Sequence, residues 1–138
     1  SILNNDATIN IQKRFVPNTN QAERVTLNFN NPLRASTLTS SQFTQSGFQA
    51  FLDDDGNGNV RIYRFNESKQ KVFINATAGT IDYTNGTVII NAFRPSAYAG
   101  IETKVTVTPD RLDIIPIREQ ILIMDVNDAT VTLVGETR

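Results

Sequence analysis

The sequence contains no cysteine and no histidine among its 138 residues. Without cysteine the chain has no disulfide bonds, no thiolate metal ligands and no cysteine nucleophile. Without histidine it has neither an imidazole metal ligand nor an imidazole proton shuttle. These absences exclude the side chains on which many catalytic and transition-metal sites depend.

A large charge of either sign is also missing. The formal net charge is −1 and the isoelectric point is about 5.3, so neither nucleic acid nor an anionic membrane is favoured as a partner. No apolar run approaches the ~20 residues of a membrane-spanning helix. The chain also lacks a G-x-S-x-G elbow and a glycine-rich phosphate loop. We therefore predict a protein that is not an enzyme, needs no cofactor, and binds neither nucleic acid nor membrane.

The clearest pattern that is present is a β-hairpin over residues 79–91, GTIDYTNGTVIIN. Its Asn85-Gly86 pair is the dipeptide that most readily forms a two-residue type I′ turn. Apolar residues alternate on both sides of this turn, as in strands with one buried face. The side chains expected on the buried faces are Ile81, Tyr83, Val88, Ile90 and Ala92.

Other runs alternate in the same way and predict further strands. They are Ala7–Val16, Val25–Phe29, Ile101–Thr108, with Ile101, Val105 and Val107 inward, and Val131–Leu133. Val60–Phe65 and Lys71–Asn75 predict a second hairpin around a five-residue loop. Ser36–Gln49 has only scattered apolar residues, and we expect a loop there with at most one helical turn.

These elements predict the fold class. Roughly eight short strands with frequent turn signals favour a mainly β protein with little helix, either an antiparallel sandwich or a partly open barrel. The length of 138 residues suits a single β-rich domain spanning 1–138. Because the chain begins at Ser1 without a methionine, we expect either a fragment of something longer or a processed product.

The acidic loop after Leu52 is a weak metal candidate. Asp53, Asp55 and Asn57, followed by Gly58, match the opening of a calcium-binding loop. The bidentate acid expected later in such a loop is replaced by Arg64. We therefore favour a solvated turn between two strands over a calcium site.

Basic residues cluster on the second predicted hairpin. Arg61, Arg64, Lys69 and Lys71 could form a site for an acidic partner surface. Alternatively, they keep an exposed hairpin face soluble and protect its edge from aggregation. We favour the second interpretation.

The run from Ile114 to Met124 differs from every other strand candidate. It is apolar on both faces at each end and has a charged middle. Such a run is either covered on both sides within the fold or is an edge that another subunit covers. Pro116 favours an edge or a bulge, because proline cannot donate to a strand ladder.

Three stretches together resemble a known family. They are residues 51–63, residues 79–100 and residues 105–134, and the most telling piece is Asp113–Leu122, DIIPIREQIL. The succession is similar to the C-terminal region of the baseplate wedge subunit of T4-like contractile-tailed phages. The resemblance covers roughly Val25 to Val134.

The resemblance implies a structural role in the virion. Subunits of this family are assembled in the bacterial host cytoplasm, pair with one another and build the inner ring of the tail baseplate. The expected partners are a second copy, as a homodimer, and other baseplate wedge and tail proteins. The expected interface residues are Ile114, Ile115, Pro116, Ile117, Arg118, Ile121 and Ile123. The alternative is a calcium-stabilised extracellular adhesion or carbohydrate-binding β module held at Asp53, Asp55 and Asn57.

Overall fold

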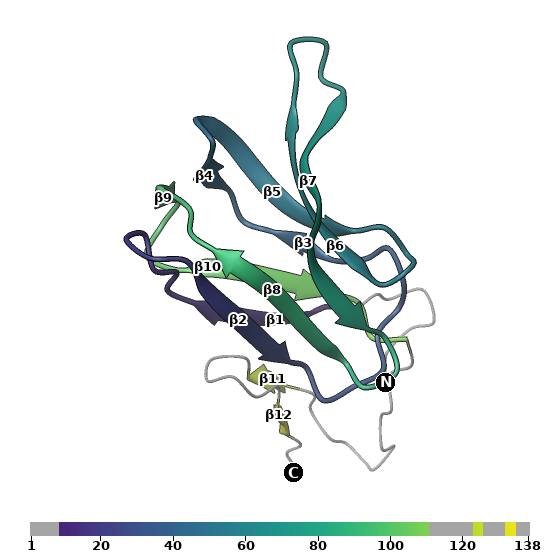
Figure 1. The fold of residues 1–138 in the computed structure, drawn as a ribbon. Coiled ribbons are helices and arrows are strands. Elements are labelled where there is room, and N and C mark those ends of the chain that lie inside the picture. The colour runs from purple at the N-terminus through teal and green to yellow at the C-terminus, as the bar shows by residue number, and fades with distance from the viewer. Residues whose placement is uncertain (1–8, 111–122, 126–131, 135–138) are drawn as a thin grey trace.

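The computed structural model of the protein describes residues 9–110, 123–125 and 132–134. Within these residues the chain forms β-strands and no helix (Figure 1). The predicted class, a mainly β antiparallel fold, is therefore confirmed. In the part of the chain that the structure describes, no helix is long and apolar enough to cross a membrane.

The strands form two packed sheets and one short ribbon. The larger sheet has seven strands in the order β2 (Glu23–Asn28), β8 (Thr87–Phe93), β7 (Lys71–Asp82), β6 (Asn59–Phe65), β5 (Phe48–Asp54), β4 (Phe43–Gln45) and β9 (Ala97–Tyr98). The smaller sheet consists of β1 (Ile11–Phe15), β10 (Thr103–Val107) and β3 (Thr39–Ser40). The ribbon consists of β11 (Ile123–Asp125) and β12 (Thr132–Val134). Every strand pair is antiparallel.

One hydrophobic core lies between the larger sheet and the smaller sheet. Ile11 and Val105 of the smaller sheet belong to the same buried cluster as Leu52, Ile62 and Val88 of the larger sheet. The alternation of apolar and polar residues along the strands explains this arrangement, because every second side chain of a strand points to the same face. Burial of these side chains is the main force holding the sheets together.

The predicted hairpin at 79–91 is confirmed as the β7–β8 pair, but its turn is not a two-residue type I′ turn. Asp82 pairs with Thr87, so four residues form the loop, and of these only Gly86 has a positive φ (75°). The Asp82 carboxylate accepts hydrogen bonds from the backbone N–H groups of Thr84 and Asn85. The loop is also fixed from outside, since Phe29 N–H donates to the Gly86 carbonyl at 2.7 Å.

A type I′ geometry occurs instead in a segment that we expected to be a loop. Residues 36–49 form β3, β4 and the start of β5, with no helical turn. Gln45 pairs with Phe48, and the two residues between them, Ser46 and Gly47, both have positive φ (55° and 82°). This is the backbone conformation that a two-residue type I′ turn requires.

Two predicted inward positions, Ala92 and Ile101, are wrong. In β8 the pairing with β2 shifts across residues 91–92, and Ala92 takes a positive φ of 47°. As a result Phe93, and not Ala92, occupies the buried face after Ile90. The prediction for Ile101 is also wrong: it precedes β10 and is 83% exposed, whereas Val105 and Val107 are buried as expected.

β7 is longer than either strand that the sequence predicted there. It runs unbroken through twelve residues and pairs with β6 along one edge and β8 along the other. Irregularities in its pairing with β6, opposite Ile62, absorb the extra residues. The five-residue loop 66–70 is confirmed at the tip of the β6–β7 hairpin, which projects from the sandwich (Figure 1).

Candidate functional site

Asp53, the first residue of the weak metal candidate, lies in β5 and is buried, with 7% of its surface exposed. Its carboxylate accepts two hydrogen bonds from the Arg61 guanidinium, from Nε and Nη2 at 2.9 Å each. It accepts a third, at 2.7 Å, from Nζ of Lys71. Asp53 also raises the pKa of Arg61, since the guanidinium is favoured beside a carboxylate.

The hydrogen-bond donors to Asp55 are different residues from those that bind Asp53. The Asp55 carboxylate accepts hydrogen bonds from Asn57 N–H at 2.7 Å and from the N–H and side-chain amide of Asn59 at 3.0 and 2.7 Å. These donors, the Asn59 side chain first, lower the pKa of Asp55. The structure therefore does not bring Asp53, Asp55 and Asn57 together as ligands. Among the described residues, no group of three or more acidic side chains could hold a metal ion.

Four aromatic side chains form a continuous group on the outer side of the larger sheet. Ring centroids lie 5.7 Å apart for Phe51 and Tyr63, 5.5 Å for Tyr63 and Phe65, and 6.4 Å for Tyr63 and Phe73. They point away from the core because their strand neighbours Leu52 and Ile62 point into it. We call Phe51, Tyr63, Phe65 and Phe73 the aromatic face.

Two of the four rings of the aromatic face are exposed to solvent. Phe65 and Phe73 keep 49% and 41% of their surface accessible to solvent. Contiguous exposed aromatic surface is uncommon on a soluble domain unless it binds something. Partial burial raises the pKa of Tyr63 above its ordinary value of 10.0.

Two positively charged side chains lie over rings of the aromatic face. The Arg61 guanidinium lies 4.3 Å from the ring centre of Phe73, and Lys71 Nζ lies 4.2 Å from that of Tyr63. Both are held by Asp53, so one carboxylate orients two positive charges over two rings. The face therefore combines apolar surface with one excess positive charge.

The structure separates the basic residues that the sequence placed in one cluster. Arg61 and Lys71 belong to the aromatic face, whereas Arg64 lies on the opposite side of β6 with its guanidinium 4.1 Å from the ring centre of Phe48. Lys69 lies in the loop at the hairpin tip, with a positive φ of 65°. The interpretation as one basic hairpin surface is therefore wrong.

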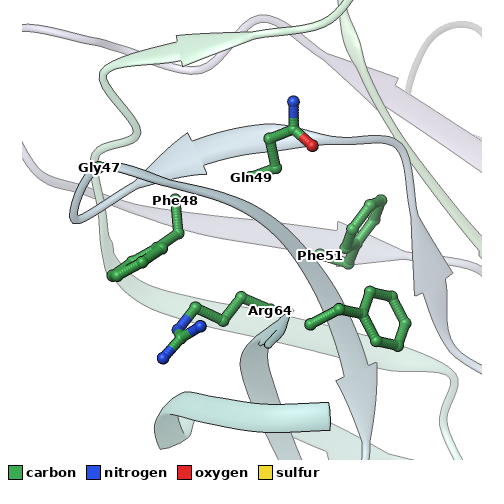
Figure 2. Close-up of a pocket in the computed structure, with 6 residues that line it drawn as sticks. Gly47, Phe48, Gln49, Phe51 and Arg64 are labelled. Atoms are coloured by element: carbon green, nitrogen blue, oxygen red, sulfur yellow. The ribbon is translucent and has the colours of Figure 1, made fainter. Parts of the chain in front are cut away.

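A notch adjoins the aromatic face where β5 and β6 separate. Residues 48–50 of β5 pair with β4, and only 51–54 pair with β6. The resulting opening has a volume of about 290 Å³ (Figure 2). It is lined by Gly47, Phe48, Gln49, Phe51, Arg64 and Phe65, and we call this site the notch.

The interface residues predicted at 114–121 lie outside the described residues, and Ile123 is described only as the first residue of β11. The aromatic face was not predicted, although the sequence carries its signal. Arg61, Tyr63 and Phe65 alternate with the core residues Val60 and Ile62, and this alternation marks a second, outward-facing row.

Comparisons of this chain with protein-family models, with curated proteins and with solved structures found no match. The candidate site is therefore defined by its geometry and by the chemistry of its side chains.

Proposed function

We propose that the chain is a structural assembly domain that acts by protein–protein contact, as part of a baseplate wedge subunit in the tail of a phage. It would be assembled in the host cytoplasm and retained in the virion. Its partners would be a second copy of itself and neighbouring wedge and tail proteins. The observation that supports a contact function is the aromatic face, with two phenylalanines more than two fifths exposed.

The composition of this face favours a protein partner. Aromatic residues and arginine are enriched at the centres of protein interfaces and dominate their binding energy. Asp53 holds Arg61 and Lys71 in fixed orientations before any partner arrives. A preordered face loses less side-chain entropy on binding, which favours affinity.

The predicted run Ile114–Ile123 is a second candidate surface for the same function. Its apolar residues and Arg118 would serve contacts with neighbours, as the family resemblance implies. An experiment on assembly must therefore compare substitutions on both surfaces.

The test is the solution mass of the protein by light scattering over a wide concentration range. We expect a dimer that Phe65→Glu and Phe73→Glu convert to a folded monomer, because a buried unpaired carboxylate opposes association. Ile101→Glu is the matched control: it adds the same charge at an exposed apolar residue outside the aromatic face and should leave the mass unchanged.

Ile117→Asp, measured in parallel, identifies which surface mediates the contact. A monomer at all concentrations for the unsubstituted chain would contradict self-association. Loss of the dimer in Ile117→Asp but not in the two phenylalanine variants would exclude the aromatic face as the contact.

A further inference from the structure

The notch exposes two strand edges that have no partner among the described residues. The backbone of residues 48–50 pairs with β4 on one side and has no strand on the other. Arg64 and Phe65 pair with Val72 and Lys71 of β7 and likewise have no strand on their free side. Free N–H and C=O groups at strand edges are a template for another extended segment.

The side chains of the notch divide between its two faces. Phe51 and Phe65 belong to the aromatic face, with ring centroids 6.0 Å apart. Phe48 and Arg64 point toward each other on the opposite face, while Gln49 points away from them (Figure 2). The volume of about 290 Å³ is at the lower end for ligand pockets, so it suits one or two side chains.

Arg64 carries a positive charge that is not neutralised by an ion pair within the described residues. Its guanidinium stacks on the ring of Phe48, and none of the ion pairs among the described residues involves it. This contact with a ring uses no hydrogen-bond acceptor, so it does not engage the N–H donors of the guanidinium. Such a fork binds a carboxylate through two parallel hydrogen bonds.

We propose that the notch binds an extended segment of a partner polypeptide in which an apolar residue stands next to an acidic one. Adjacent side chains of an extended segment point to opposite faces. The apolar side chain would contact Phe51 and Phe65, and the carboxylate would bind Arg64 on the other face. This inference rests on the proposed assembly function and names the chemistry of the partner at that site.

The test uses the full chain and two blocked hexapeptides, Thr-Thr-Val-Asp-Thr-Thr and the same sequence with asparagine in place of aspartate. Titrations followed by calorimetry give both dissociation constants. We expect the aspartate peptide to bind about tenfold more tightly, because the asparagine peptide cannot form a charge-assisted pair with Arg64. The preference should weaken as salt is added.

Two arginine variants provide the matched comparison. Arg64→Gln should abolish the preference for aspartate, whereas Arg24→Gln, at an exposed position of β2, should preserve it. Failure of the aspartate peptide to bind, equal binding of the two peptides, or an unchanged preference in Arg64→Gln would each overturn the proposal. Binding of succinate as tightly as the peptide would also overturn it, since the site would then recognise a free anion.

These outcomes are separable from those of the assembly proposal. Phe73 belongs to the aromatic face but does not line the notch. If Phe73→Glu disrupts the dimer while the peptides do not bind, the assembly function holds and the notch inference fails. If the peptides bind with the expected preference while the chain is monomeric, self-association fails and the notch is a site for a different protein.

Discussion

At the scale of single residues, Asp54 links segments that are distant in sequence. It is buried, and its carboxylate accepts hydrogen bonds from the backbone N–H groups of Ser36 and Leu38 at 2.9 Å each. The same carboxylate accepts a hydrogen bond from the hydroxyl group of Tyr83. Three adjacent aspartates thus differ in role: Asp53 binds two cations, Asp54 joins the backbone of residues 36–38 to Tyr83 in the β7–β8 loop, and Asp55 shapes a turn.

Tyr83 provides a pH-dependent prediction at this scale. Partial burial, followed by the hydrogen bond to Asp54, raises the pKa of Tyr83 to about 12 from an ordinary value of 10.0. A raised pKa in the folded state stabilises the fold fully below the unfolded pKa, and this contribution disappears as pH rises through the folded pKa. We therefore expect Tyr83 to contribute to a fall in the free energy of unfolding between pH 10 and pH 12.

Urea unfolding at several pH values in this range measures that fall. In Tyr83→Phe the fall should be smaller, because the titrating hydroxyl is gone while the lysines titrate as before. Identical pH dependence in the two proteins would contradict the assignment.

At the scale of elements, the irregular pairing of β7 lets one strand serve two hairpins. Near the irregularity, Gly79 lies directly against β8: a Cβ placed there would be 2.0 Å from the carbonyl oxygen of Ile89. Only glycine permits this approach of two backbones.

We expect Gly79→Ala to lower the free energy of unfolding by about 3 kcal/mol, because the added methyl group forces the two backbones apart. Gly47→Ala is the matched control. Gly47 has a positive φ of 82° but no heavy atom near the added carbon, so the change should cost only about 1 kcal/mol from backbone strain. Urea unfolding of the two variants makes the comparison, and equal losses would show that β7 and β8 can separate freely at Gly79.

At the scale of the whole molecule, the smaller sheet packs on only one side of the larger sheet, and no strand of the described ranges packs on its outer side. The smaller sheet packs against the inner side of the larger sheet, with the core between them. The aromatic face lies on the outer side of β5, β6 and β7. A sheet with one face in the core and one face exposed is usual for antiparallel folds. Here the exposed face carries rings and fixed charges, and this is the basis of the proposed contact function.

Calcium should not stabilise the molecule as a whole. A ligand that binds only the folded state raises the midpoint of thermal unfolding. The oxygens of Asp53 are engaged by Arg61 and Lys71, and those of Asp55 by Asn57 and Asn59. We expect the same midpoint in millimolar calcium and in EDTA. A calcium-dependent rise that Asp55→Asn removes would instead support the adhesion or carbohydrate-binding alternative.

The sequence by itself determined the strands and their buried faces wherever apolar and polar residues alternate within one short segment. Val105 and Val107 alternate with polar residues and lie in the core, because steric rules within a strand send successive side chains to opposite sides. The loop at 66–70 followed from turn chemistry in the same way. The opening of the loop at Asp53, Asp55 and Asn57 matched a calcium loop in residue types, but spacing alone could not place Asp53 against Arg61 and Lys71.

Features that depend on contacts between segments distant in sequence were decided only by the tertiary structure. Phe93 replaced Ala92 in the core because burial of a phenylalanine outweighs the strain of one bulge. The four-residue turn at Gly86 is held by local bonds to Asp82 and also by the hydrogen bond that the distant Phe29 N–H donates to the Gly86 carbonyl. The aromatic face exists because strand register aligns Phe51, Tyr63 and Phe73 across three strands. Register is set by burial across the whole sheet, and one strand read alone does not contain that information.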